Sequence, residues 1–464
     1  MSSRGPQTAL KPEPQVVWRG ADVTIGEVLG ALDAIRKKFA RQEAGPTEQP
    51  HPRNCVLTLV AVASDDQEER RAQRVCRVIG AQHPAQVIVI REQAPMHGGH
   101  IEASISTDVQ RPLLSCAVEC ELVTLRVRGG AGEHLDALID PLLISGVPTY
   151  LWWVGTPPFG TRELDDALKI CDALLVDSAR FDAPYHSFLG LSRLTTNRHR
   201  RLGLADFQWS RLGPWREAIA AFFSPAERRG FLAGISAVGI DYAGEGRGNR
   251  VGAGLLTGWL ASALAWKLQS AVGGAGGVVA AHYAAEAWRP IEVNFRSVPR
   301  ARLASGELST VRVTGSSGGQ TFQLTVQRDP ERTPSAAADL SFRSLHMPGG
   351  GDEAGLELAE RKAEWHRDVL HENRDALHHT ATGQPPGDGA PRRPTVFTRE
   401  RRRDDSALLL LTMIQIGAGD TLRHVQRVDP EDDATLLLDL LAGGTHDPVF
   451  NRSLLAAADL MHSV

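Results

Sequence analysis

The first 180 residues alternate between short apolar runs and longer segments whose apolar residues recur every three or four positions. The runs predict buried or half-buried strands, and the longer segments predict amphipathic helices. The predicted strands are residues 55–63, 86–90, 100–107, 118–127, 148–154 and 173–176, and the predicted helices are residues 24–39, 65–79, 133–144 and 161–170. This alternation predicts an N-terminal layered α/β domain with a partly parallel sheet.

Two local signals sharpen the helix boundaries. Thr24 and Glu27 have the spacing of a capping box, which predicts the start of the first helix. Pro141 lies inside residues 133–144 and predicts that this helix is broken or kinked there.

The pattern changes after residue 182. Residues 185–270 read as mainly helical, with one strand candidate at residues 235–242, and residues 292–295, 308–314 and 321–327 read as an antiparallel set. Residues 352–379 predict a long polar helix, and residues 407–461 an apolar strand or helix followed by two short helices. We therefore expect an α+β C-terminal domain with an antiparallel sheet and helices.

Two further segments complete the predicted domain organisation. Residues 1–16 are polar and proline-rich, which predicts a disordered tail. Residues 380–394 contain four prolines and three glycines, which predicts a mobile linker. The expected domains are then residues 17–180 and residues 181–464.

Composition narrows the class of protein. Apolar residues make up 42% and charged residues 23% of the chain, and the formal net charge is −4, too close to neutral for a dedicated nucleic-acid binder. The longest strongly apolar run, residues 251–266, is too short to span a membrane, and the N-terminus lacks the apolar core of a signal peptide. None of the five cysteines lies beyond Cys171. We expect a cytoplasmic protein without a membrane anchor.

The glycine-rich segment at residues 244–252 lies between a predicted strand and a predicted helix, where a phosphate-binding loop would lie. It matches neither the G-x-G-x-x-G nor the Walker pattern. It is therefore either an ordinary loop or a weak anion-binding candidate, whose residues would be Gly244, Gly246, Gly248 and Arg250.

Other candidates for chemistry have simpler interpretations. Ser178 is not within a G-x-S-x-G motif and is read as a strand-end cap or turn. Cys116 and Cys120 are too far apart along a strand for a disulfide and are read as core residues. The histidines at 366, 371, 378 and 379 lack metal-site spacing, and the arginines at 392–403 read as a solvated run. We predict no metal site, no cofactor and no catalytic residues.

Two aromatic stretches could form contact surfaces or ordinary core. Residues 147–158 place two tryptophans on opposite faces of one strand. Residues 207–216 combine tryptophan with arginine, the types that interface hot spots favour, so the partner-binding candidates are Trp209, Arg211, Trp215 and Arg216. We expect Trp215 in the core, and Arg211 and Arg216 at the surface, where they could meet carboxylates of a partner.

Five blocks also carry a family resemblance: residues 143–158, 175–181, 206–222, 254–268 and 436–456. In this order they resemble the glucose-6-phosphate dehydrogenase assembly protein OpcA family. The resemblance implies a bacterial, non-enzymatic partner that assembles or activates this NADP-dependent dehydrogenase. Some relatives respond to thioredoxin through cysteines in the C-terminal half; this chain has none there, so we expect activation to depend little on oxidation state.

Two other functions compete with this expectation. The first is a sugar-phosphate-binding enzyme that uses residues 244–252 as its anion site, and the second is a nucleic-acid binder, which the net charge of −4 disfavours.

Overall fold

In the computed structural model the described residues are 15–43, 55–82, 84–93, 99–110, 118–129, 134–196, 202–244, 249–286, 289–299, 303–329, 408–428, 432–443 and 445–464. The chain divides into two compact units. The first comprises Met1–Gly319 and Glu431–Val464, and the second comprises Gln320–Pro430.

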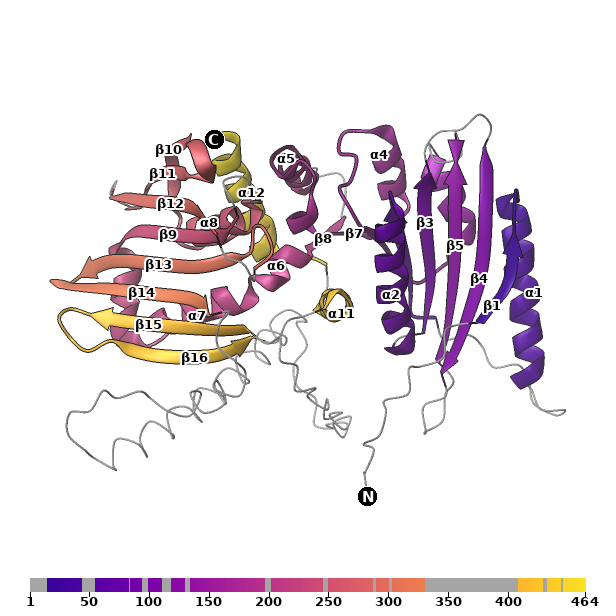
Figure 1. Cartoon of the computed structure of the whole chain (residues 1–464), viewed down its shortest axis with the longest axis horizontal. Helices are drawn as coiled ribbons and strands as arrows, with labels where there is room; N and C mark the ends of the chain where they lie inside the picture. Colours follow the sequence, from indigo (N-terminus) through magenta and orange to yellow (C-terminus); the bar gives the residue numbers. More distant parts are fainter. Residues whose placement is uncertain are drawn as a thin grey trace, which may run out of the picture. The chain divides into compact units, whose positions relative to one another are not determined.

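Eight described strands of the first unit form one sheet in the order β1-β4-β5-β3-β2-β6-β7-β8 (Figure 1). Adjacent strands are parallel from β5 to β8, whereas β4 and β1 are antiparallel additions at the β5 edge. Their bounds are β1 Gln15–Gly20, β2 Leu57–Ala63, β3 Ala85–Gln93, β4 His100–Gln110, β5 Val118–Arg128, β6 Thr149–Trp153, β7 Ala173–Val176 and β8 Gly203–Asp206. The predicted α/β class with a partly parallel sheet is confirmed.

The parallel strands follow the order of a doubly wound nucleotide-binding fold. From β2 the chain moves outward through β3 to β5, then returns to β6 on the other side of β2 and continues to β7 and β8. This is the order 3-2-1-4-5-6, in which ligands bind beyond the carboxyl ends of the strands where the direction reverses. Here the reversal lies between β2 and β6. One departure is that the antiparallel strand β4, rather than a helix, connects β3 with β5.

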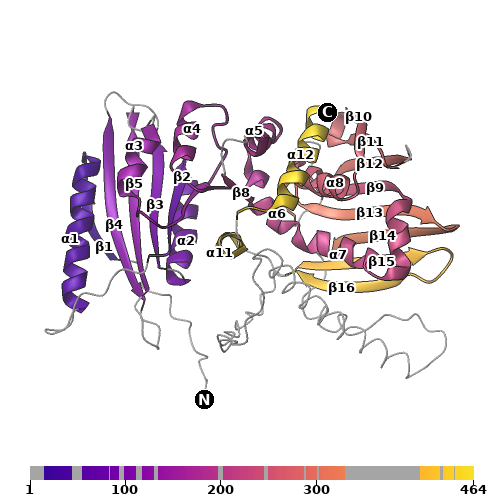
Figure 2. The same ribbon diagram turned by 180° about the vertical axis from the view of Figure 1, so that it is seen from behind.

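Helices lie on both faces of this sheet. One face is covered by α2 (Asp66–Gln82) and α11 (Asp433–Gly443), whose apolar side chains pack with Leu59 and Trp152 in one core cluster. Figure 2 shows α3 (Leu135–Ile139) on the opposite face. Every residue of β2 is buried, as expected for a strand covered on both faces.

The predicted helix signals are confirmed. The capping box closes at the start of α1 (Ile25–Glu43), where the Thr24 amide donates to Glu27 Oε2 at 2.7 Å and the Glu27 amide donates to Thr24 Oγ1 at 3.3 Å. The helix with Pro141 breaks as predicted, because α3 ends at Ile139 and a 3-10 turn follows at Asp140–Leu142. The predicted helix at residues 161–170 is α4 (Arg162–Lys169), capped by Thr161.

The rest of the first unit contains a second set of strands, in the order β10-β11-β12-β9-β13. All pairs are antiparallel except β12 with β9, which are parallel. The strand β9 lies between β12 and β13, which the sequence suggested as members of one antiparallel set. The bounds are β9 Ile235–Ala243, β10 Lys267–Gly273, β11 Val279–Ala284, β12 Pro290–Val298 and β13 Leu308–Ser317. Residues 185–270 are mainly helical, as predicted, but this region also contains β8 and the start of β10, two strands that we did not predict.

Two long helices pack tightly beside these strands. They are α8 (Val251–Ala263) and α12 (Pro448–His462). A Cβ added to Gly258 would lie 2.2 Å from the carbonyl oxygen of Ser453, so only glycine permits this approach. The remaining helices are α5 (Pro184–Thr196), α6 (Phe207–Arg211) and α7 (Gly213–Phe223).

The second unit is a three-stranded antiparallel arrangement in the described residues. Its strands β14 (Gln320–Asp329), β15 (Leu408–Ile416) and β16 (Leu422–Val428) pair in chain order. The predicted polar helix at residues 352–379, the predicted linker at 380–394 and nearly all of the predicted tail at 1–16 lie outside the described residues.

The predicted division near residue 180 stays a prediction. The first sheet continues beyond that point to β8 at Gly203–Asp206. In the described part of the chain, we find no helix with both the length and the apolar character needed to cross a membrane.

Candidate functional site

The candidate site is the edge of the first sheet where its parallel strands end. Asp177 directly follows β7, and Asp206 is the last residue of β8. Arg71 reaches this edge from α2, Arg211 from α6, and Asp433 from the first turn of α11. Carboxyl ends of parallel strands lie at one edge, so these groups meet although they are far apart in sequence.

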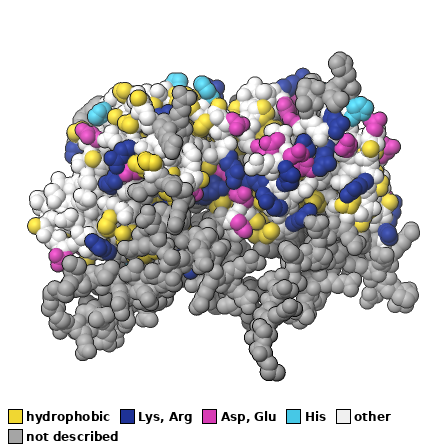
Figure 3. Space-filling model, viewed as in Figure 1, with side chains coloured by type: hydrophobic (Ala, Val, Ile, Leu, Met, Phe, Trp, Pro, Cys, Tyr) yellow, Lys and Arg dark blue, Asp and Glu magenta, His cyan; other side chains and the backbone are white. Residues whose placement is uncertain are grey.

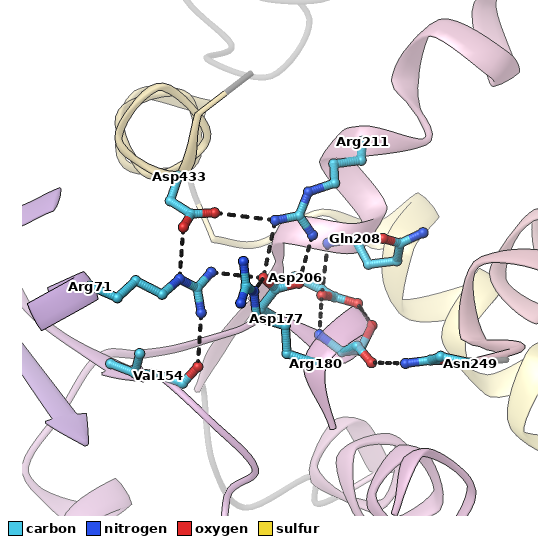
Figure 4. Close-up of polar contacts among 10 residues, drawn as sticks. Arg71, Val154, Asp177, Arg180, Asp206, Gln208, Arg211, Asn249 and Asp433 are labelled. Carbon is cyan, nitrogen blue, oxygen red and sulfur yellow. Dashed lines mark hydrogen bonds and ion pairs between the residues drawn. The ribbon is translucent and has the colours of Figure 1, made fainter. Parts of the chain in front are cut away.

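An ion-pair network joins Arg71, Asp177, Arg211 and Asp433 (Figure 4). Arg71 donates from Nη2 to Asp177 Oδ2 at 2.8 Å and from Nε to Asp433 Oδ2 at 2.7 Å. Its Nη1 donates to the Val154 carbonyl oxygen at 3.0 Å. Arg211 binds Asp177 with two bonds, of 2.6 and 3.0 Å. The Asp177 side chain is 0% exposed and that of Arg71 7% exposed, so the centre of the network is desolvated, whereas Arg211 and Asp433 are partly exposed.

The charges of this network support one another. Burial alone would raise the pKa of Asp177, but Arg211, Arg71 and Arg180 outweigh it and hold that pKa below its usual value. For Asp433, burial again acts upward, and the bond from Arg71 brings its pKa below the ordinary value. Both carboxylates are therefore ionised at neutral pH. We call the four residues of this network, Arg71, Asp177, Arg211 and Asp433, the clamp.

Asp206 lies next to this clamp but is not paired with a cation. It accepts hydrogen bonds from the amide of Ser178 at 3.0 Å, the hydroxyl of Ser178 at 2.5 Å and the amide of Gln208 at 3.0 Å. Its burial raises its pKa to about 6. Asn249 Nδ2 donates to the Ser178 carbonyl oxygen at 2.9 Å and so links this cluster to the start of α8.

Ser178 does not have the environment of a nucleophile. It is 0% exposed, and its hydroxyl donates to a carboxylate rather than to a histidine. The interpretation as a strand-end turn is confirmed, because Ser178 begins a 3-10 turn immediately after β7.

The turn after β2 occupies the position where a dinucleotide's pyrophosphate would bind in this strand order. No glycine lies between Ala63 and the start of α2. Asp65 Oδ1 accepts from the amides of Gln67 at 2.7 Å and Glu68 at 2.8 Å, and Glu68 Oε2 accepts from the amide of Ser64 at 2.7 Å. The amides that would bind phosphate already hold carboxylates. These residues do not fit a dinucleotide, because like charges repel.

A cleft of about 730 Å³ opens beside this turn. Its lining contains acidic, basic and uncharged polar residues: Ser64, Asp65, Asp66, Gln67, Arg70, Arg91, Glu92, Gln93 and Arg128. Burial, together with the neighbouring carboxyl group of Glu163, raises the pKa of Glu92 to about 8. Arg91 forms ion pairs with Asp66 and with Glu69, so part of the positive charge in the cleft is neutralised within the chain.

Of the four predicted partner-binding residues, the structure brings Trp209 and Arg216 into contact, largely below the surface. Trp209 is 5% exposed, and its Nε1 donates to Asp447 at 2.9 Å; Trp215 is 2% exposed, as expected for a core residue. The Arg216 guanidinium lies 3.6 Å from the Trp209 ring centroid, and its burial lowers its pKa to about 10. Arg211 belongs to the clamp.

Arg211 and Arg216, which we expect at the surface, reach it only in part, because both side chains are partly buried. Asp177 and Asp433 attract Arg211 inward and leave its side chain 24% exposed, and Trp209 holds Arg216 by a cation–π contact. Whether these residues contribute to partner binding stays a prediction.

The glycine-rich loop lies between β9 and α8, as expected. Only the two ends of this loop belong to the described residues. Gly246 and Gly248 lie outside the described residues, as do the histidines at 366–379, Cys116 and the arginines at 392–403. At the start of α8, Asn249 Oδ1 already accepts from the Val251 amide at 2.9 Å. The roles of Gly244 and Arg250 as anion ligands stay a prediction.

The sequence reasoning missed Arg71, Asp206 and Asp433. One signal was present: Asp177 follows a predicted parallel strand, and such positions converge at one edge of a sheet. A second signal was helical spacing, since Arg71 lies four positions before Val75, on the apolar side of α2, whereas Arg70 lies on its polar side. No group of three or more histidine, cysteine, aspartate or glutamate residues suited to a metal ion occurs within the described ranges.

Comparison with solved structures finds distant likenesses. UDP-N-acetylglucosamine 3-dehydrogenase GnnA from Acidithiobacillus ferrooxidans covers 88% of this chain and 98% of its own, with 11% identity and a TM-score of 0.34. The match to an NAD-binding protein from Listeria innocua covers 88% of this chain and 93% of that protein, with 10% identity and a TM-score of 0.35. Scores this low establish neither a shared fold nor a shared activity.

The sequence comparisons are more informative. An OxPP cycle protein OpcA from Synechocystis sp. is 26% identical over 79% of this chain and 78% of its own length. One from Nostoc punctiforme is 28% identical over 72% of this chain and 68% of its own length. Residues 76–193 match the family model described as the glucose-6-phosphate dehydrogenase subunit N-terminal domain, and residues 202–454 match the corresponding C-terminal domain. The chain therefore belongs to the OpcA family of glucose-6-phosphate dehydrogenase subunits.

Proposed function

We propose that this chain is a non-catalytic assembly factor or allosteric activator of glucose-6-phosphate dehydrogenase, which supports NADPH production in the oxidative pentose phosphate pathway. The observation that carries the proposal is the match of residues 76–193 and 202–454 to the two domains of the dehydrogenase subunit family. The relatives named as OxPP cycle proteins support the same pathway. The expected location is the cytoplasm.

The geometry of the strand ends supports a non-catalytic role. The carboxylates of Asp65 and Glu68 accept hydrogen bonds from the backbone amides that a dinucleotide would need. The Arg71 guanidinium occupies the sheet edge just after β6, where it donates to the Val154 carbonyl oxygen. The clamp is fully paired, so it offers no free acid or base to a substrate. A binding protein needs none of these groups to be accessible.

The stretch with Trp209, Arg211, Trp215 and Arg216 remains our hypothesis for partner binding. Its buried tryptophans and inward-facing arginines favour a role beneath a contact surface, where they would hold that surface rigid.

The test is a rate measurement with purified proteins. The chain alone should produce no NADPH from glucose 6-phosphate and NADP. Added to the dehydrogenase, it should lower the glucose 6-phosphate concentration needed for half-maximal rate or raise the maximal rate. If the effect is allosteric, glucose 6-phosphate should tighten the complex by the same factor by which the complex tightens substrate binding.

Two results would contradict the proposal. NADPH formation by the chain without dehydrogenase would show that it is an enzyme. Unchanged dehydrogenase kinetics and no complex formation at saturating concentrations of the chain would remove the assembly or activator role.

A further inference from the structure

The outer face of α2 carries a stripe of arginines, defined as Arg70, Arg74 and Arg77. All three are exposed, and none of their side chains forms an ion pair or hydrogen bond with another described residue. Residues spaced by three and four positions lie on one side of a helix, so the three guanidinium groups share a face. Figure 3 shows Lys and Arg side chains gathered over this part of the first unit.

The stripe does not stabilise its own helix. Arg70 and Arg74 are four positions apart and Arg74 and Arg77 three, and like charges at these spacings destabilise a helix. Cations near the last turn would interact favourably with the helix dipole, but the last turn of α2 contains none. The acidic residues of α2, Asp66, Glu68 and Glu69, are confined to its first turn, so they do not separate the arginines.

Two arginines of β5 lie nearby but are already paired. Arg126 and Arg128 have side chains that are 44% and 37% exposed, and they form ion pairs with Glu69 and Glu102. The unpaired positive charge is therefore that of the stripe itself. Arg70 lines the cleft together with Arg91 and Arg128, so one end of the stripe leads into a concave surface that could receive a side chain from another protein.

We propose that the arginine stripe is a docking surface for an acidic face of a partner protein, whose carboxylates pair with Arg70, Arg74 and Arg77. This inference rests on the proposed function, in which the chain binds the dehydrogenase. Carboxylates placed opposite the stripe would relieve the repulsion between neighbouring arginines, and arginine can hold each of them with two hydrogen bonds. The stripe is also the part of α2 that the fold leaves free for such pairing.

The surroundings favour carboxylates on a protein over a nucleic-acid backbone. Asp65 and Asp66 are exposed at the near end of the stripe and would repel a continuous polyanion. A protein partner can place its carboxylates only opposite the arginines. The formal net charge of the chain, −4, points the same way.

The test compares two triple charge reversals in the full chain. One variant carries R70E, R74E and R77E; the control carries R193E, K267E and R289E, three exposed cations on other elements. The stripe variant should bind the dehydrogenase about 30-fold more weakly, because like charges then meet across the interface. The control should stay within about threefold of wild type. Wild-type affinity should fall as salt rises, and the stripe variant should lose most of this dependence.

A milder variant guards against misfolding. R70Q, R74Q and R77Q together remove charge without reversing it, and this variant should keep wild-type unfolding behaviour while binding about tenfold more weakly. If the wild-type chain binds the dehydrogenase and both stripe variants bind equally well, the docking surface lies elsewhere and only this inference fails. If the wild-type chain does not bind at all, the proposed function fails with it. Binding of a DNA duplex that is lost in the stripe variants but kept in the control would assign the stripe to nucleic acid instead.

Discussion

Arg70 and Arg71 are adjacent in sequence, yet Arg70 is exposed and Arg71 is buried, because successive residues of a helix point to different sides. Arg71 is 7% exposed and is bound to Asp177, Asp433 and the Val154 carbonyl oxygen. Arg70 is exposed and has no ion-pair partner among the described residues. One helix therefore uses the same residue type to hold the sheet edge together on its inner face and to present unpaired charge on its outer face. Burial and partners determine an arginine's contribution to the fold.

Replacing Arg71 by methionine should produce the largest effect of this comparison. The substitution removes one cation from the buried carboxylate of Asp177 and the partly exposed carboxylate of Asp433, and we expect a loss of about 3 kcal/mol in unfolding free energy. Urea unfolding monitored by circular dichroism measures it. The matched control is R70M, which changes the neighbouring residue in the same way and should stay within about 0.5 kcal/mol of wild type. Equal losses in both variants would contradict the assignment of Arg71 to a stabilising clamp.

A second, smaller effect distinguishes the two buried carboxylates by pH. Asp206, with a pKa raised to about 6 by burial, keeps its proton to higher pH in the folded state than in the unfolded chain. Its contribution to stability is therefore complete below about pH 4 and is lost as the pH rises toward 6. Asp177 has the opposite sign: its pKa is lowered, so its contribution is complete at neutral pH and is lost in acid.

The substitution Asp206→Asn isolates the first effect. Its side chain can still accept the two amide bonds, and it does not ionise. The difference in unfolding free energy between D206N and wild type should change by on the order of 2 kcal/mol between pH 4 and pH 6, in favour of the variant at the higher pH. A difference that is constant over this range would show that Asp206 is ionised throughout it.

The smallest expected effect concerns the outer face alone. Replacing Arg74 by glutamine removes the central charge of the stripe and its repulsion with Arg70 and Arg77. We expect unfolding free energy to rise by about 0.3 kcal/mol or less. Thermal unfolding at low salt measures this change, and high salt should abolish it. A clear loss of stability would mean that Arg74 has a stabilising contact that we have not identified.

The sequence predicted the strands β2 to β7 of the first sheet and the helices between them because each has a strong local pattern, whereas β1 and β8 were missed. The capping pair Thr24 and Glu27 and the break at Pro141 depend only on neighbouring residues, so they could be read directly. The strand β8 was missed because only Leu204 and Ala205 of its four residues are apolar, whereas all four residues of the equally short β7 are. Its place at the sheet edge depends instead on its parallel pairing with β7.

The candidate site was much harder to predict, since its contacts are remote in sequence. Arg71 meets partners that are 106 and 362 residues away. Helical spacing places Arg71 beside the apolar side of α2, but it does not reveal which carboxylates bind the guanidinium there. For the same reason Arg211 was expected at the surface, whereas two distant carboxylates hold it inside.

The position of α11 has a consequence for the order in which the protein can fold during synthesis. Leu436 and Leu437 lie in the same core cluster as Leu59 and Trp152, and Asp433 completes the clamp on Arg71. The sheet that is translated first thus depends on side chains that are translated almost last. We infer that the N-terminal strands wait, with part of their apolar face uncovered, until the end of translation brings α11 to them. A chain that stops before residue 433 would leave that face exposed to solvent and to other chains.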